Sequence, residues 1–300
     1  MPTLIEKIKE LKAAKGAVIL AHTYQPAEIQ EIADFVGDSY ALAVKASQLK
    51  DARLIVFCGV RFMAETACIL NPGKKVVMPD ADAGCPMADM ISGEQLVAFK
   101  KEHPDAPVVC YVNSTADVKA ESTICCTSSN AEKVVKSLGD VPEILFVPDQ
   151  CLGRYIGEKL GRKMVLWNGY CPIHFALTPE SIRDARAKHP NAKVMVHPET
   201  RAVVQAEADY ILSTGQMIDL VRGTEGEYIV GTECGILTAL KLAAPKATFY
   251  PVEPPMVCAD MKKTTLEKLL ACLESESPVI TVPEDVAAKA LKSIEKMLNA

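Results

Sequence analysis

The chain has 300 residues, 49% of them hydrophobic, and a formal net charge of −5. A chain of this length can bury a substantial core, and the lack of an overall positive charge argues against nucleic acid as a partner. No apolar run approaches a membrane span, and eleven cysteines without a secretory signal favour a reducing compartment, so we expect a cytoplasmic protein with no membrane partner.

Residues 1–16 have the pattern of a charged amphipathic helix, and an alternation of strands and helices follows. An apolar run at 17–21 ends at His22. Residues 54–80 then have the pattern of a strand, a turn, a helix of about ten residues and another strand. The same order recurs from residue 107 and again from residue 192, which predicts three similar units in succession.

Alternating strands and helices predict an α/β fold class with parallel sheets. We expect three similar, three-layer α/β domains related by pseudo-threefold symmetry around a central active site. Segments 92–104 and 178–190 each begin with a hydroxyl cap and carry Glu in the first turn, which indicates helix starts at the boundaries. The domains are predicted at residues 1–88, 89–174 and 175–262. Residues 263–300 are predicted to form a tail that packs back onto the first domain.

Three cysteines recur at almost equal intervals, since Cys85, Cys171 and Cys258 are 86 and 87 residues apart. Each follows a short apolar run and a turn, so each thiol is expected in a loop just past a strand. Three thiolates converging on one point form a metal site with an open coordination position, which suits a Lewis-acid cluster better than a structural four-ligand site.

A second recurrence joins strand ends to hydroxyl residues. His22, Tyr111 and His197 each end an apolar run. A hydroxyl residue follows each of them seventeen residues later, at Ser39, Ser128 and Thr214. Ligands of open parallel sheets bind beyond the carboxyl ends of the strands, and helix N-termini attract anions. The pattern predicts a pocket for a small, multiply anionic substrate, although plain helix capping also accounts for the hydroxyls.

The remaining cysteines have simpler interpretations. Small core residues are the preferred interpretation of five of them: Cys58, Cys68, Cys110, Cys234 and Cys272. Cys151 is expected in a loop and stays ambiguous. A loop containing Cys125 and Cys126 is the main rival metal site, but the pair has no counterpart in the other two units. His174 follows Cys171 closely and could support a ligand, but is not predicted as a site residue.

Seven short blocks run in order from the first strand to the last of the three spaced cysteines. They are AHTYQ at 21–25, DFVGDS at 34–39, YVNS at 111–114, CTSSNA at 126–131, HPE at 197–199, STGQM at 213–217 and VCADMKKTTLEKL at 257–269. Together they resemble the signature blocks of the quinolinate synthase family. The resemblance covers nearly the full chain, and the ordered set is far more specific than any single block.

The resemblance implies an enzyme, a transferase of NAD biosynthesis, that condenses iminoaspartate with dihydroxyacetone phosphate to quinolinate, phosphate and water. It also implies three α/β domains around one 4Fe-4S cluster, with Cys85, Cys171 and Cys258 as ligands. Substrate contacts carried over from the family's blocks are His22, Ser39, Tyr111, Val112, Asn113, Ser128, His197, Pro198, Glu199 and Thr214. Two departures are Thr23, where Asn or Tyr is more usual, and the absence of a CxxCxxC cluster around Cys258.

Within this resemblance, Glu199 is the best-placed general base, because it closely follows His197 at a strand end. His22 and His197 are expected to hold the substrate's anionic groups, and Tyr24 to act as an assisting acid or a gate. The open iron of the cluster would supply a Lewis acid.

Two other functions fit the same residues. One is another hydro-lyase with an open-site iron–sulfur cluster, with a three-cysteine zinc site as its variant. The other is a non-catalytic iron–sulfur sensor. For the preferred function, docking with the aspartate oxidase or dehydrogenase that supplies iminoaspartate is an expectation that the sequence does not test.

Overall fold

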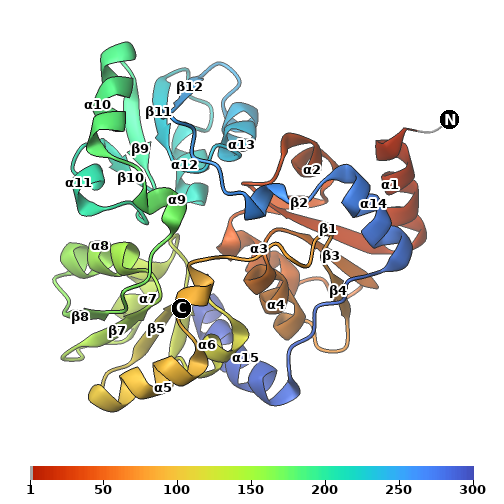
Figure 1. Ribbon diagram of the computed structural model, residues 1–300, viewed down its shortest axis with the longest axis horizontal. Helices are drawn as coiled ribbons and strands as arrows, with labels where there is room; N and C mark the ends of the chain where they lie inside the picture. The colour runs from red at the N-terminus through yellow and green to blue at the C-terminus, as the bar shows by residue number, and fades with distance from the viewer. Residues whose placement is uncertain (1–2) are drawn as a thin grey trace.

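The computed structural model describes residues 3–300 and contains, within that range, three four-stranded sheets whose strands are all parallel (Figure 1). Their strand orders are β2-β1-β3-β4, β6-β5-β7-β8 and β10-β9-β11-β12. The three sheets therefore have one topology, and the prediction of three similar α/β domains is confirmed. None of the helices over residues 3–300 has the length and apolar character of a membrane span.

The first domain is built around a strand pair, β1 and β3, that is buried on both faces. Its elements are α1 (Leu4–Ala14), β1 (Ala17–His22), α2 (Ala27–Ile32), β2 (Phe35–Gly37), α3 (Ser39–Ser47), β3 (Leu54–Cys58), α4 (Arg61–Leu70) and β4 (Lys75–Val77). Helix α1 begins with a capping box formed by Thr3 and Glu6. Continuous apolar runs such as LIVFC suit strands that helices cover on both sides.

The second domain follows the same order. Its elements are η1 (Ala88–Met90), α5 (Gly93–Glu102), β5 (Val108–Tyr111), α6 (Ala116–Ala120), β6 (Ile124–Cys126), α7 (Ala131–Ser137), β7 (Ile144–Val147), α8 (Gln150–Leu160), β8 (Met164–Leu166) and α9 (Pro172–Phe175). Ser92 caps α5 as predicted. Two loop predictions are wrong. Cys151 lies in the first turn of α8, and Cys125 and Cys126 lie in strand β6, because both segments are buried between the sheet and its helices.

The third domain repeats the pattern once more. Its elements are α10 (Pro179–Lys188), β9 (Lys193–Val196), α11 (Ala202–Gln205), β10 (Tyr210–Ile211), α12 (Thr214–Val221), β11 (Glu227–Gly231), α13 (Ile236–Ala243), β12 (Thr248–Pro251) and η2 (Asp260–Lys262). Thr178 caps α10, as predicted. In all three domains, the loop after the fourth strand carries one of the three regularly spaced cysteines.

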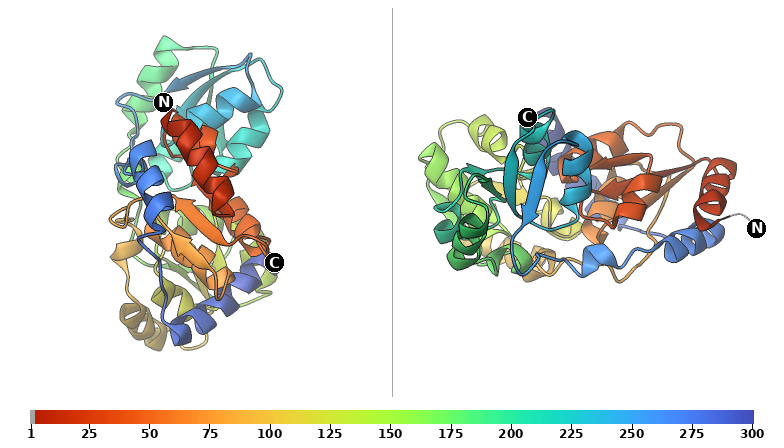
Figure 2. Two further views of the ribbon diagram at one scale, coloured as in Figure 1. Left: turned by 90° about the vertical axis from the view of Figure 1, so that its right-hand side faces the viewer. Right: turned by 90° about the horizontal axis from the view of Figure 1, so that it is seen from above.

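The C-terminal tail divides between two domains. Helix α14 (Leu266–Ser275) packs against α1, and Val279 pairs with Val77 of β4, so this part lies on the first domain (Figure 2). Helix α15 (Glu284–Asn299) packs mainly against α6 and β6 of the second domain and also contacts α4 of the first domain. The reason is its apolar stripe, Ala290, Ile294 and Met297, which covers buried side chains of the second sheet.

Replacing Ile294 by Ala is expected to lower the free energy of unfolding by about 2–5 kcal/mol, because the side chain is fully buried between α15 and the second sheet. Denaturant unfolding would measure it. Lys292→Ala, on the exposed face of the same helix, is the control and should change stability by less than about 0.5 kcal/mol. Equal effects would contradict the packing of α15.

Glu276 fastens the tail to the first domain. It ends α14 in a left-handed conformation (φ 51°), and its carboxylate lies 3.0 Å from the Nζ atoms of Lys15 and Lys75 and 3.2 Å from Arg53. Hydrogen bonds from Lys75 and Lys15 lower the pKa of Glu276 from 4.5 to about 2. Its stabilising contribution is therefore complete above pH 4.5 and is lost as the pH falls towards 2.

We expect Glu276→Gln to flatten the pH dependence of stability between about pH 5 and 3. Thermal unfolding of both proteins across that range would test this. Glu225→Gln, which removes an exposed ion pair with Lys246, is the matched control. If the stability of Glu276→Gln depends on pH as steeply as that of the wild type, the three cations do not stabilise the ionised carboxylate in the folded protein.

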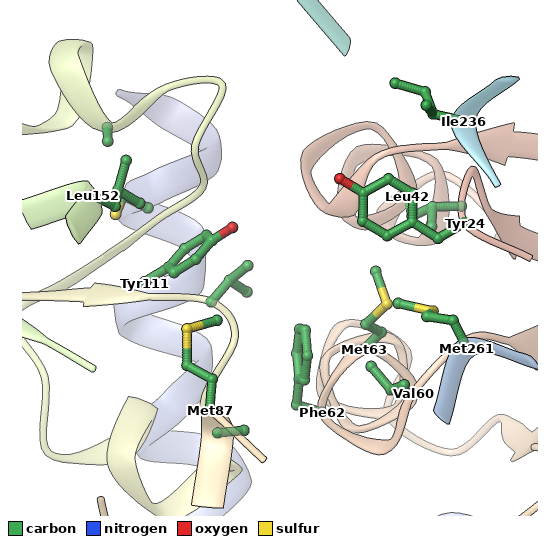
Figure 3. Close-up of a cluster of buried hydrophobic side chains, with 14 of the residues drawn as sticks. Tyr24, Leu42, Val60, Phe62, Met63, Met87, Tyr111, Leu152, Ile236 and Met261 are labelled. Carbon is green, nitrogen blue, oxygen red and sulfur yellow. The ribbon is translucent and has the colours of Figure 1, made fainter. Parts of the chain in front are cut away.

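Side chains from all three domains meet at the centre of the molecule (Figure 3). Tyr24 of the first domain lies near Ile236 of the third domain and Met261. Tyr111 of the second domain lies between Leu152 and Met87. The carboxyl ends of the strands therefore face one common region, which is where ligands of parallel sheets bind.

Candidate functional site

A cavity of about 260 Å³ lies at this centre. Twelve of the predicted site residues line it: His22, Tyr24, Ser39, Cys85, Tyr111, Asn113, Ser128, Cys171, His197, Glu199, Thr214 and Cys258. They come from all three domains, and most lie within three residues of the end of a strand or the start of a helix.

Two predicted substrate contacts are not part of the cavity lining. Val112 packs into the hydrophobic core beside the cavity. Pro198 is buried, and its carbonyl accepts a hydrogen bond of 2.9 Å from Gln205 Nε2. Each neighbours residues that do line the cavity, so a sequence block identifies the strand end but not which of its side chains points inward.

Helix capping does not account for the hydroxyls of Ser39 and Thr214. The residues before them cap the helices instead: Asp38 Oδ1 accepts from Ala41 N (2.8 Å), and Ser213 Oγ accepts from Gln216 N (3.3 Å). Ser39 and Thr214 are the first residues of α3 and α12, and Ser128 precedes α7 by three positions. The three hydroxyls are thus free of capping and lie where helix N-termini favour anions.

The three domains also touch directly beside these helix ends. Ser129 Oγ donates to Asp38 Oδ2 and lies 3.0 Å from Ser213 Oγ, so one hydrogen-bonded group joins all three. A Cβ at Gly215 would lie 2.8 Å from Asp38 Oδ2, which explains the glycine in the STGQM block. These contacts fix the distances between the three helix ends.

Glu199 is the buried charge at the centre of the site. Tyr111 Oη donates to its Oε1 (2.5 Å), and His174 Nδ1 lies 2.7 Å from its Oε2. Burial alone would raise the pKa of Glu199, but attraction to His197 and His174 and hydrogen bonds from His174 and Tyr111 outweigh it and lower the pKa. The carboxylate is therefore ionised and held between two donors.

The imidazoles of His22 and His197 and the phenol of Tyr111 are kept neutral. Burial lowers the pKa of His22 and of His197 from 6.5 to about 3. Burial and the charge of Glu199 raise the pKa of Tyr111 well above 10. His197 Nε2 lies 3.2 Å from Ser128 Oγ, which ties a neutral imidazole to one of the anion-binding hydroxyls.

His174 is the main residue that the sequence interpretation missed. It lies on the short helix α9, three residues after Cys171, and its Nδ1 is 3.2 Å from the Cys171 thiol. The signal was the CPIH segment, because residues three apart on a helix share a face. Asp38 and Glu233 also line the cavity and were not predicted.

The three cysteines suit a soft metal centre. Burial raises the pKa of Cys85 to about 12, and it also raises the pKa of Cys171 and Cys258, so a bound cation is what would hold them as thiolates. Cys171, His174 and Glu199 form a second possible ligand set, with atoms within 4.8 Å of one another. That set shares Cys171 but contains one thiol, which suits zinc rather than an iron–sulfur cluster.

A buried carboxyl group supports the Cys258 loop. Glu233 stands two residues after β11, and its Oε1 accepts from Cys258 N (3.2 Å). Asp149 stands at the equivalent place after β7, where its Oδ1 accepts from Leu152 N (2.7 Å) and its Oδ2 has no hydrogen-bond partner among the described residues. The first domain has Val60 there, and a backbone hydrogen bond from Arg61 N to Ala83 O (2.8 Å) takes over the role.

Lys262 connects this support to the first domain. Its Nζ lies 2.9 Å from Glu233 Oε1 and donates to the carbonyl oxygen of Tyr24. A Cβ at Gly235 would lie 2.6 Å from that carbonyl, so the third domain approaches the Tyr24 turn closely. The Cys258 loop and the Tyr24 turn are therefore held as one unit.

Comparison with known proteins identifies the family of this chain. The family model described as quinolinate synthetase A protein matches residues 6–299. A quinolinate synthase of Dehalococcoides mccartyi (strain CBDB1) is 56% identical over 294 residues, covering 98% of this chain and 97% of that protein. Quinolinate synthase 1 of Methanosarcina acetivorans is 49% identical over 296 residues, with the same coverage. The chain belongs to the quinolinate synthase family.

Proposed function

We propose that the chain condenses iminoaspartate with dihydroxyacetone phosphate to give quinolinate, phosphate and water, with a 4Fe-4S cluster as cofactor. One observation carries the proposal: a single cavity contains three thiols, three hydroxyls at or near helix N-termini and the ionised carboxylate of Glu199. This combination matches two anionic substrates that must be joined, deprotonated and dehydrated.

Cys85, Cys171 and Cys258 would hold the cluster, because they come from three separate loops and line the same cavity. A cluster with three cysteine ligands leaves one iron open, which supplies Lewis-acid chemistry for the loss of a hydroxyl group. Glu233 would keep the Cys258 loop in place through the backbone N–H group of that cysteine.

The anionic groups of the substrates would bind at the helix ends. Ser39, Ser128 and Thr214 present hydroxyls there, and the partial positive charge of each helix end favours carboxylate or phosphate. Asn113 Oδ1 is buried without a hydrogen-bond partner among the described residues, so it can accept from a substrate N–H or O–H. Binding both substrates this way fixes their orientation and raises their effective concentration.

Glu199 is the general base in this proposal. Ring formation requires removal of protons from carbon and transfer of protons to departing oxygen, and Glu199 is ionised inside the cavity with both oxygens oriented. Tyr111 and His174, the two hydrogen-bond donors, also lie close enough to Glu199 to exchange a proton with it after it has accepted one. Tyr24 assists from the first domain, with its hydroxyl 3.0 Å from Thr214 Oγ1.

An imine is short-lived in water, so we further propose that iminoaspartate reaches this cytoplasmic protein from an aspartate oxidase or dehydrogenase close by. A mixed assay tests this supply route. If a trap for free iminoaspartate added to the coupled enzymes lowers quinolinate less than it does with preformed iminoaspartate, supply is direct, and equal losses would rule out direct supply.

An anaerobic assay with both substrates, after reconstitution with iron and sulfide, tests the function itself. Quinolinate should form only when both substrates are present. Dehydration of another hydroxy acid without a pyridine product would favour the hydro-lyase. A fully loaded protein that makes no product, and whose cluster spectrum is unchanged by substrate analogues, would favour the sensor.

A further inference from the structure

Each domain carries a buried nitrogen donor at the same distance from the end of its first strand. The donors lie on the short helix that follows this strand, which is α2 in the first domain, α6 in the second and α11 in the third. They are Gln30, Lys119 and Gln205, and all three side chains are buried. Each stands eight residues after the strand-end residue of its domain, which is His22, Tyr111 or His197. Buried donors need acceptors, so their partners show what they hold.

Gln205 holds the turn that carries Glu199. Its Nε2 donates to the carbonyl oxygens of Pro198 (2.9 Å) and Thr200 (2.7 Å), the residues on either side of Glu199. A hydrogen bond of 3.0 Å from Thr200 N to His197 O closes the turn. Both protons of the amide are therefore used on one turn, and the peptide groups around Glu199 cannot rotate without leaving a buried carbonyl unpaired.

Gln30 makes the same pair of contacts in the first domain. Its Nε2 donates to Thr23 O (3.0 Å) and Gln25 O (2.8 Å), which lie on either side of Tyr24. It also donates to Gly235 O of the third domain (3.0 Å). Tyr24 thus occupies the same place in its turn as the central carboxylate does in the third domain, two residues after the strand-end histidine.

The second domain keeps the donor but changes the residue. Lys119 Nζ donates to Ser114 O (2.7 Å), the carbonyl directly after Asn113. Its other hydrogen bond among the described residues goes to Phe62 O of the first domain (3.4 Å). Asn113 again stands two residues after the strand-end residue, Tyr111. Since lysine replaces glutamine here, the feature that the three turns share is the nitrogen donor and not the amide.

The residue held in each turn lines the cavity. These residues are Tyr24, Asn113 and Glu199. We propose that the two glutamines, Gln205 and Gln30, are positioning residues that orient the intervening side chain by fixing the carbonyl groups on either side of it. Neither glutamine lines the cavity, so each acts through the residue that it holds. This inference rests on the proposed function only where turnover is measured.

The Gln205→Met variant keeps the length of the side chain but removes both donated hydrogen bonds. We expect kcat for quinolinate to fall roughly tenfold with KM nearly unchanged, because the base is misdirected while the substrate contacts remain. Gln150→Met is the matched control, since the Gln150 amide donates at the surface, to Asn168 Oδ1 (2.9 Å), and its kcat should equal that of the wild type. If Gln205→Met does not fold, Gln205→Asn takes its place, because the shorter amide cannot reach both carbonyls.

Double-mutant cycles separate positioning from general support of the fold. In the Glu199→Gln background, Gln205→Met should cost at least about threefold less in kcat than in the wild type, whereas in the Tyr24→Phe background its cost should be unchanged. Gln30→Met should show the reverse pattern. Equal costs in every background, or a Gln205→Met enzyme as active as Gln150→Met, would overturn the proposal.

Hydrogen exchange tests the contact without turnover. The Thr200 amide donates within the turn, so we expect it to exchange at least about tenfold faster in Gln205→Met than in the wild type, while the amides of β9 keep their protection. Unchanged exchange at Thr200 would contradict the proposal that Gln205 fixes the turn. If the wild type makes no quinolinate, the proposed function fails, while the exchange rates still test the role of Gln205 in the turn.

Discussion

The Glu199→Gln variant is expected to form quinolinate roughly 10²- to 10⁴-fold more slowly than the wild type, which is the contribution typical of a general base. Glutamine keeps the size of the side chain and can still accept from Tyr111, but it cannot take up a proton. It also presents an N–H group to His174 Nδ1, which now lies 2.7 Å from Glu199 Oε2. Single-turnover formation of quinolinate under anaerobic conditions would measure the effect.

Glu227→Gln is the control for this variant, because Glu227 is an exposed glutamate of the third domain on β11, away from the cavity. Its activity should equal that of the wild type. A Glu199→Gln enzyme within about threefold of the wild type would assign the base to another group, since that loss is far below what a general base contributes. Iron content should be the same in all three proteins, which separates loss of the base from loss of a cluster.

Replacing Cys258 by Ala is expected to abolish quinolinate formation and to prevent retention of a 4Fe-4S cluster. The thiol lines the cavity with Cys85 and Cys171, and two remaining thiols cannot complete a three-cysteine site. Iron and sulfide analysis after anaerobic reconstitution, together with the visible spectrum, would measure cluster content independently of turnover.

This variant also separates two metal sites, because Cys258 does not belong to the Cys171, His174 and Glu199 set. A Cys258→Ala protein that still binds one zinc and keeps its activity would identify that set as the true centre. Cys68→Ala serves as the control, since Cys68 is a half-buried thiol of α4 outside the cavity lining. It should retain both the cluster and the activity.

The sequence was sufficient to predict the features that repeat. The alternation of strands and helices and the three cysteine loops follow local patterns that occur three times, so agreement between the three copies is unlikely to be chance. Strand-end residues such as His22, Tyr111 and His197 were predictable for the same reason. Each of them lies at the carboxyl end of a buried strand, which is where ligands of parallel sheets bind.

The features that escaped prediction depend on how the domains dock. His174 is a single residue without a counterpart in the repeat, and its role comes from Glu199, which lies more than 20 positions away in the sequence. The main packing partner of helix α15, the second domain, was also not predictable, because its apolar stripe fits any uncovered sheet face. Local patterns describe which face of an element is apolar, but not which neighbour covers it.

The common topology of the three domains has a consequence for how chemistry can be distributed. A ring of three identical subunits would have to present the same side chain three times at every equivalent place. In a single continuous chain, the sequence of each domain can change independently of the other two. The equivalent positions after the third strand of each sheet are therefore Val60, Asp149 and Glu233. The three sheets are nearly symmetric, but the side chains that line the cavity are not. An asymmetric substrate can therefore bind in one orientation only.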